Sequence, residues 1–181
     1  EPADLTGAIT AQTNVDCNGN STGSVTVAGD VGTGTAPFLY STDGGATTQA
    51  SGTFSGLSVG SLTVTIVDDN GCTEDVPVTI TEPADLTGAI TAQTNVDCNG
   101  NSTGSVTVAA DAGTGTAPYL YSTDGGATTQ VSGTFSGLSV GALTVTIVDD
   151  NGCTEDVPVT ITEPTDLTGA ITAQTDLGCN G

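Results

Sequence analysis

The sequence predicts an all-β protein of tandem immunoglobulin-like antiparallel β-sandwich domains, arranged as beads on a string. Three observations support this prediction. Apolar and polar residues alternate with a period of two, turn-forming Asn-Gly and Asp-Gly pairs separate the alternating runs, and the whole pattern recurs after 81 residues. Short alternating runs closed by turn residues are typical of the strands of a β-sandwich. No segment combines the length of a helix with a period of 3.6 residues.

The clearest strands lie in the second half of the first copy. Residues 61–66 and 76–81 alternate between apolar side chains and mostly Thr or Ser, which indicates strands with one buried face. Asp69-Asn70-Gly71 lies between the two runs and predicts a hairpin turn. Pro77 predicts that the second strand is at a sheet edge, because proline cannot donate a hydrogen bond to a neighbour. The apolar members are Leu62, Val64 and Ile66, then Val76, Val78 and Ile80.

Shorter apolar runs supply the remaining strands, for a total of six or seven in each copy. They are separated by further turn signals, such as Asn18-Gly19 and Asp43-Gly44-Gly45. The apolar residues of these runs are Leu5, Ile9 and Ala11; Val25 and Val27; Phe38 and Tyr40; and Phe54 and Leu57.

The internal repeat defines the domain organisation. Residues 1–81 form the first Ig-like repeat, residues 82–162 the second, and residues 163–181 the start of a truncated third, and we expect the array to continue at both ends. The period is too long for a solenoid, whose units span about 20–50 residues, so each copy is expected to have its own core. The first two copies differ at five positions: Gly29/Ala110, Val31/Ala112, Phe38/Tyr119, Ala50/Val131 and Ser61/Ala142.

The composition excludes several classes of function. The chain has no Lys, Arg or His but 21 acidic residues, which give a formal net charge of −21. Without His or Lys there is no Ser-His-Asp triad, no Schiff base and no imidazole metal site. The negative charge repels nucleic acid and anionic membranes. A carboxylate pair remains conceivable chemistry, but few aromatic residues are available to line a cleft, so we expect no enzyme activity.

The cysteines indicate disulfide bonds, and hence an oxidising, extracellular compartment. Each complete copy carries two cysteines, and the third copy contributes Cys179, whose partner is expected outside the fragment. Pairing within each copy is the first interpretation, and it would close a loop of about 55 residues. The alternative is a bridge between adjacent domains, which becomes plausible if the two loops lie at opposite ends of a domain. The within-copy pairs would be Cys17–Cys72 and Cys98–Cys153.

An acidic segment after the strand at residues 61–66 is a candidate calcium site. Its carboxylate and amide oxygens are the ligands that Ca²⁺ prefers, although the twelfth-position Glu of a calcium-binding loop is missing. The alternative is an acidic hairpin turn exposed to solvent. We expect no other cofactor. The candidate ligands are Asp68, Asp69, Asn70, Glu74 and Asp75 in the first copy, and Asp149, Asp150, Asn151, Glu155 and Asp156 in the second.

Two segments match the pattern of N-glycosylation. Asn20 and Asn101 are each followed by Ser-Thr, which makes them candidate acceptors. The pattern also arises by chance in a chain this rich in Ser and Thr, residues that solvent-facing strand positions favour.

Several motifs together resemble the SprB repeat, and the same motifs recur in the second copy from Cys98 to Cys153. The resemblance implies a very large cell-surface adhesin of gliding bacteria that is exported by type IX secretion and forms surface filaments. A Trp that is usual in the family is absent near Thr42, and Leu62 stands where Tyr is common, which weakens the idea of a sugar-binding platform. The motifs are Cys17-Asn18-Gly19, Gly23-Ser24-Val25-Thr26-Val27, Pro37-Phe38-Leu39-Tyr40-Ser41, Gly56-Leu57-Ser58-Val59-Gly60, Val64-Thr65-Ile66-Val67-Asp68-Asp69-Asn70-Gly71-Cys72 and Ile80-Thr81-Glu82-Pro83.

Two hypotheses for the function follow. In the first, the chain is a disulfide-stapled structural repeat of an adhesin stalk or filament on the cell surface, as the near-identity of the copies suggests. Its partners would be neighbouring repeats of the same chain and other copies in a filament. In the alternative, each repeat is an adhesive module that binds a carbohydrate, another surface ligand or calcium and gains strength through multivalency.

Overall fold

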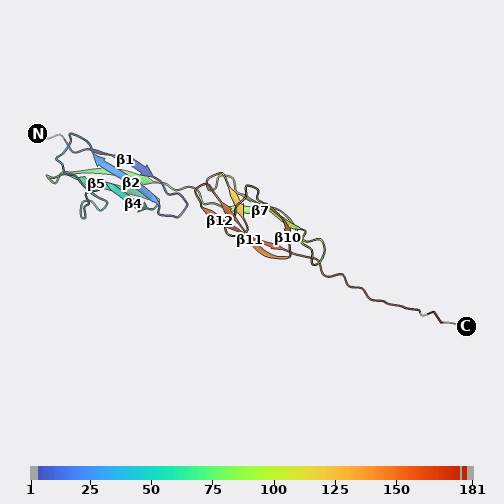
Figure 1. Cartoon of the computed structure of the whole chain (residues 1–181). Coiled ribbons are helices and arrows are strands. Elements are labelled where there is room, and N and C mark those ends of the chain that lie inside the picture. The colour runs from blue at the N-terminus through green and yellow to red at the C-terminus, as the bar shows by residue number, and fades with distance from the viewer. Residues whose placement is uncertain (1–3, 176, 179–181) are drawn as a thin grey trace. The chain divides into compact units, whose positions relative to one another are not determined.

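The computed structural model describes residues 4–175 and 177–178, and these residues form strands and loops only (Figure 1). The predicted all-β fold is confirmed. In this described part of the chain, no helix is long and apolar enough to cross a bilayer.

The first copy contains two three-stranded sheets. One sheet has the order β1-β2-β4 and the other the order β3-β5-β6, and all neighbouring strands run antiparallel. Figure 1 shows β1, β2 and β4 side by side. The strands are β1 (Gly7–Thr13), β2 (Gly23–Gly29), β3 (Leu39–Ser41), β4 (Thr53–Leu57), β5 (Gly60–Val67) and β6 (Thr73–Ile80).

The second copy repeats this arrangement strand for strand. Its sheets have the orders β10-β8-β7 and β12-β11-β9. The strands are β7 (Gly88–Thr94), β8 (Gly104–Ala110), β9 (Leu120–Ser122), β10 (Thr134–Leu138), β11 (Gly141–Val148) and β12 (Thr154–Ile161).

A core of aliphatic side chains joins the two sheets of the first copy. β2 contributes alternate buried residues from one sheet, and β5 and β6 contribute them from the other. This is the expected result of period-two sequences, because successive side chains of a strand point to opposite faces. The immunoglobulin-like topology remains a prediction. The buried apolar residues are Leu5, Val15, Val25, Val27, Tyr40, Val64, Ile66, Val76, Val78 and Ile80.

The β5–β6 hairpin confirms two predictions from the sequence. Its turn contains Asn70-Gly71, and Gly71 has a φ of 81°, a value that L-residues rarely adopt. β6 is at the end of the order β3-β5-β6, so Pro77 lies on an edge strand, where its missing N–H costs no ladder hydrogen bond.

Two of the five differences between the copies lie at one contact. A Cβ placed on Gly29 would approach the ring of Phe38 to 2.9 Å. In the second copy the equivalent residues are Ala110 and Tyr119, and the Tyr119 hydroxyl donates a hydrogen bond to the Thr114 carbonyl over 2.5 Å. Both members of this contact therefore differ between the two copies.

The structure divides into two compact units whose limits do not coincide with the repeats. The first unit comprises Glu1–Thr87, Ala110–Tyr119 and Val148–Glu155. The second comprises Gly88–Ala109, Leu120–Ile147 and Asp156–Gly181. The first unit thus contains the first copy together with three segments of the second, residues 82–87, 110–119 and 148–155. The predicted boundaries at 81/82 and 162/163 stay predictions.

The segment that opens the third copy has no strand among its described residues. Leu167 is 96% exposed, whereas the equivalent Leu86 is 5% exposed. In the first two copies this segment continues into β1 or β7, which pairs with β2 or β8. Residues 163–181 contain no counterpart of β2.

Candidate functional site

The most distinctive site of the first unit is a disulfide bond between consecutive copies. Cys17, in the β1–β2 loop, is bonded to Cys153, which directly precedes β12. The two Cα atoms are 5.6 Å apart, and 136 positions separate the residues in the sequence. Both cysteines are half-buried, whereas Cys72 and Cys98 are exposed free thiols.

The within-copy pairing that we predicted first is therefore wrong for Cys17, Cys72, Cys98 and Cys153, and the alternative between copies holds. The reason is the length of β6. The Val15 N–H donates to the Thr81 carbonyl, which places the Cys17 loop near the end of β6, while Cys72 directly precedes its start. Eight strand residues span about 26 Å, far beyond the roughly 4.4–6.8 Å between Cα atoms in a disulfide. Cys179 lies outside the described residues.

The loop that carries Cys17 is ordered by Asp16. One Asp16 carboxylate oxygen accepts hydrogen bonds from the Thr22 hydroxyl over 2.7 Å and the Cys17 N–H over 2.7 Å. The Thr22 hydroxyl, followed by the Asn20 amide, holds the pKa of Asp16 below its ordinary value of 3.8. The charged carboxylate therefore organises the turn that presents the cysteine.

The same loop is fixed to the segment that leaves the first copy. The Asn18 amide donates to the Pro83 carbonyl over 3.1 Å, and the Gly19 N–H donates to the Glu82 carboxylate over 2.8 Å. These contacts hold the loop against the chain that leads to β7.

The loop that carries Cys153 is organised by a second, buried carboxylate. Asp149 is 5% exposed and accepts hydrogen bonds from the N–H groups of Thr116, Asn151 and Cys153 over 2.8, 3.0 and 2.8 Å. The Asn151 amide also donates to the Asp16 carbonyl over 3.1 Å, beside the disulfide. Cys153 is thus oriented by its own hairpin and by a polar contact with the other loop.

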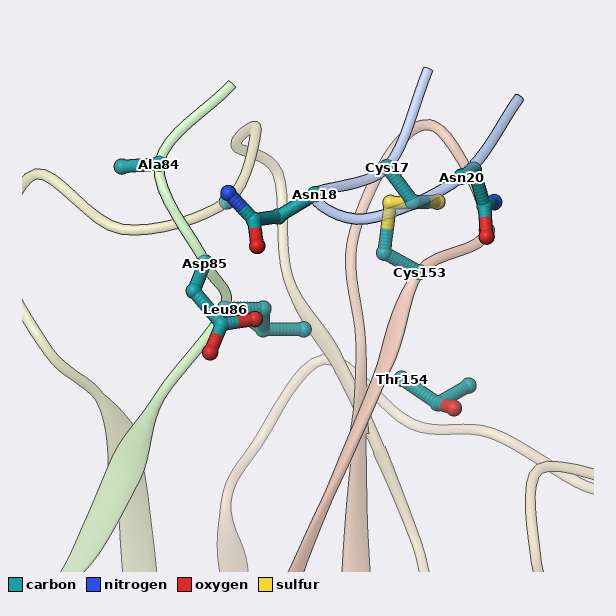
Figure 2. Close-up of a pocket in the computed structure, with 10 residues that line it drawn as sticks. Cys17, Asn18, Asn20, Ala84, Asp85, Leu86, Cys153 and Thr154 are labelled. Atoms are coloured by element: carbon teal, nitrogen blue, oxygen red, sulfur yellow. A yellow bond between two sulfur atoms is a disulfide. The ribbon is translucent and has the colours of Figure 1, made fainter. Parts of the chain in front are cut away.

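A polar hollow of about 280 Å³ lies beside the disulfide. Figure 2 shows Asn18 and Asp85 on one side of it and the disulfide with Thr154 on the other. Leu86 is part of its wall and is 5% exposed. The lining offers amide, carboxylate and hydroxyl groups.

The predicted calcium ligands do not gather into one site. Across the part of the chain that the structure describes, no group of three or more Asp, Glu or Cys side chains could hold a metal ion. Asp68 accepts hydrogen bonds from backbone N–H groups, and Asp75 accepts one from the Thr65 hydroxyl over 2.7 Å. Burial alone would raise the pKa of Asp68, but the N–H groups of Cys72, Thr35 and Asn70 outweigh it and keep the pKa below 3.8. Calcium binding remains a prediction that this geometry does not favour.

The candidate glycosylation residues are exposed. The side-chain amide of Asn20 donates to the Asp16 carboxylate over 3.3 Å, and that of Asn101 donates to Asp97 over 3.2 Å. A glycan would attach to the nitrogen that makes this contact. Glycosylation at both residues stays a prediction.

Sequence reasoning also missed Asp43, a carboxylate that orders the loop after β3. Asp43 accepts hydrogen bonds from the hydroxyl groups of Ser41 and Thr47, each over 2.6 Å. The Ser41 hydroxyl, and then Thr47, lower the pKa of Asp43 from 3.8 to about 2, and Asp124 in the second copy behaves in the same way. The signal was present in the sequence as Asp-Gly-Gly with Thr four residues after the Asp.

We expect these two carboxylates to contribute to acid sensitivity. Because folding depresses their pKa, their contribution is complete above about pH 4 and is lost as the pH falls towards about 2. The double variant Asp43→Asn and Asp124→Asn should therefore show a smaller fall in melting temperature between pH 5 and 2 than the unchanged chain. Thermal unfolding followed by circular dichroism at several pH values measures the melting temperatures of both chains.

The matched control is Asp69→Asn with Asp150→Asn, which removes the same charge from the exposed hairpin turns. If the control flattened the pH profile as much as the double variant does, relief of general charge repulsion would explain the result instead.

The sequence and the structure of the chain are similar to those of known proteins. The structure is that of an all-β repeat protein with a disulfide between two copies, and such a bond is consistent with an extracellular protein. The family described as SprB repeat matches residues 9–47 and 90–128, which confirms the resemblance to that family in both copies. No curated protein matches the chain.

One solved structure that matches the chain is Drosophila OTK, extracellular domains 3-5. It is 16% identical, with a TM-score of 0.31, and the match covers 88% of this chain and 61% of the other. This chain therefore spans less than two thirds of that protein's length, and a likeness of this size carries no argument about function.

Proposed function

We propose that the chain is a structural repeat segment of a cell-surface adhesin stalk or filament, in which disulfide bonds join consecutive copies. The Cys17–Cys153 bond carries this proposal, because it connects the β1–β2 loop of one copy to the β11–β12 loop of the next. A bond in this position supports continuity along the chain.

Three further observations support the structural role. The first two copies differ at only five positions, so no copy carries a distinctive side-chain set. Both copies match the SprB repeat, and resemblance to this family implies a repeat of a cell-surface adhesin. The sequence has no His or Lys, so its Ser, Thr and Cys side chains lack the imidazole or amine base that commonly activates such nucleophiles.

A pulling experiment tests this role. When the chain is stretched from its ends, the disulfide shields the 136-residue loop from extension. At roughly 3.4 Å per residue, reduction should release about 450 Å of additional contour length. Single-molecule force spectroscopy with and without a reductant measures the difference, and the double variant Cys17→Ser with Cys153→Ser is the control that should give the full length in both conditions. Equal lengths for the oxidised and reduced chain would contradict the proposal.

A second candidate function rests on a groove that recurs in both copies. The groove has a volume of about 610 Å³ in the first copy and about 430 Å³ in the second. Phe54 and Phe135 occupy equivalent places in it, among Ser and Thr hydroxyl groups. An aromatic ring beside hydroxyl groups suits a carbohydrate, and a weak site in every copy would gain strength through multivalency.

A glycan array separates the two candidates. If the groove binds sugars, the chain should bind a reproducible set of glycans, and the double variant Phe54→Ala with Phe135→Ala should lose that binding. The control is Val59→Ala with Val140→Ala, which trims aliphatic side chains of the same groove and leaves the aromatic rings. Repeating the glycan array with Ca²⁺ present and absent tests the calcium hypothesis. No binding under either condition leaves the structural role as the better account.

A further inference from the structure

The Cys17–Cys153 bond does not join cysteines that are neighbours in the sequence. Cys72 and Cys98 lie between its two ends, so the bond encloses both of them. They lie inside the enclosed segment regardless of how the sequence continues. While the chain is being oxidised, Cys17 therefore has two nearer partners than the residue to which it is finally bonded.

In the unfolded chain, the native pair is the least probable of the six pairs that the four cysteines up to Cys153 can form. Its members are 136 positions apart in the sequence. Cys17 and Cys72 are only about 55 positions apart, and Cys72 and Cys98 about 26, and the entropic cost of closing a flexible loop of n residues grows as about (3/2)RT ln n. The two shorter loops should therefore close roughly fourfold and roughly twelvefold more often than the native loop. The first bonds to form are expected to be these shorter ones.

The folded first copy cannot retain a Cys17–Cys72 bond. The Val15 N–H donates to the Thr81 carbonyl over 3.0 Å, which holds the Cys17 loop near the end of β6. Cys72 directly precedes the start of β6, and eight strand residues span about 26 Å. The Cα atoms of a disulfide are roughly 4.4–6.8 Å apart. A Cys17–Cys72 bond that forms early must therefore break before β6 can take its place in the sheet.

Folding reverses the preference among the pairs. The Asp16 carboxylate accepts the Cys17 N–H over 2.7 Å, and the Asp149 carboxylate accepts the Cys153 N–H over 2.8 Å, so each cysteine is held by its own loop. The Asn151 amide joins the two loops by donating to the Asp16 carbonyl over 3.1 Å. In this arrangement the Cα atoms of Cys17 and Cys153 are 5.6 Å apart. Tertiary contacts thus select the native pair, after the shorter loops have had the first opportunity to close.

We propose that the Cys17–Cys153 bond is reached by rearrangement of an earlier Cys17–Cys72 bond, so that the chain is a substrate of a thiol–disulfide exchange catalyst. A thiolate of the catalyst attacks the sulfur of Cys17, forms a mixed disulfide with it and releases the Cys72 thiolate. The Cys153 thiolate then attacks Cys17 and releases the catalyst thiolate. One S–S bond breaks for each that forms, the proton lost by Cys153 passes to Cys72, and no oxidant or reductant is consumed. This step goes beyond the structural role and does not depend on adhesion.

The experiment follows oxidative refolding of the full chain with Cys179→Ser, so that four cysteines compete. The reduced chain is diluted from urea into a mixture of oxidised and reduced glutathione, and samples are quenched with a thiol-alkylating reagent at successive times. Cleavage before aspartate places the four cysteines in separate peptides, and mass spectrometry quantifies each linkage. Early samples should contain more Cys17–Cys72 than Cys17–Cys153. Compared with the same mixture without enzyme, a purified protein disulfide isomerase should accelerate the appearance of the native bond at least tenfold.

The matched control is the same chain with Cys72→Ser and Cys98→Ser, in which Cys17 has no partner other than Cys153. Here the isomerase should change the rate of bond formation by less than about twofold, because no mispaired bond needs to be rearranged. The proposal would be overturned if Cys17–Cys153 were the first bond to appear in the four-cysteine chain, or if the isomerase did not accelerate its formation there. Equal acceleration in the control would also overturn it, because the enzyme would then act on folding or oxidation and not on a mispaired bond.

Discussion

Removal of the disulfide between the copies is expected to have the largest effect on stability. The double variant Cys17→Ser with Cys153→Ser opens a loop of 136 positions, and the chain-entropy relation gives a loss of about 5 kcal/mol for a loop of that length. Urea denaturation of the full chain, followed by circular dichroism, measures this change in the free energy of unfolding.

The matched control replaces the two free thiols, Cys72→Ser with Cys98→Ser. Both residues are exposed and unbonded within one chain, so the expected change is within about 0.5 kcal/mol. Equal stability of the two double variants would mean that the bond adds no constraint to the unfolded chain.

Truncation of the central core residue is expected to have the next largest effect. Ile66 is 0% exposed and lies on β5, the middle strand of its sheet. Ile66→Ala should cost about 2–5 kcal/mol, because it removes buried methyl groups and leaves a cavity. Ile147→Ala should have a similar effect in the second copy, where Ile147 is also 0% exposed. Urea denaturation again measures the change in the free energy of unfolding.

Val31→Ala is the control for this substitution. Val31 is fully exposed, and the second copy carries Ala112 at the equivalent position, so the change should be close to neutral. A loss below about 1 kcal/mol for Ile66→Ala would show that the core relaxes around the missing atoms.

The strands were predictable because local patterns determine them. The alternation in β5 and β6 identified the buried faces, and Asn70-Gly71 identified the turn between them. Pro77 identified the sheet edge through its missing N–H. Each of these inferences depends on neighbouring residues alone.

The pairing of the cysteines was not predictable in this way. An even number of cysteines in each copy indicates disulfides, but it does not say which loops meet. That depends on the eight residues of β6, which keep Cys72 away from Cys17, and on the contact between a loop of the first copy and a hairpin of the second. The ordering role of Asp43 was missed for a different reason. Its partners Ser41 and Thr47 are close to it in the sequence, but their hydroxyl groups meet the carboxylate through the conformation of the folded loop.

The position of the disulfide also has a consequence for the survival of the chain after cleavage. Every peptide bond between Cys17 and Cys153 lies inside the closed loop, including those of the exposed turns at Gly44-Gly45 and Gly125-Gly126. Exposed turns of this kind are the preferred places for proteolytic nicks. A single nick anywhere in the loop leaves the two fragments joined through sulfur, so the segment before Cys17 remains connected to the segment after Cys153. Under oxidising conditions, one broken backbone bond inside this loop thus leaves the two ends of the chain covalently connected.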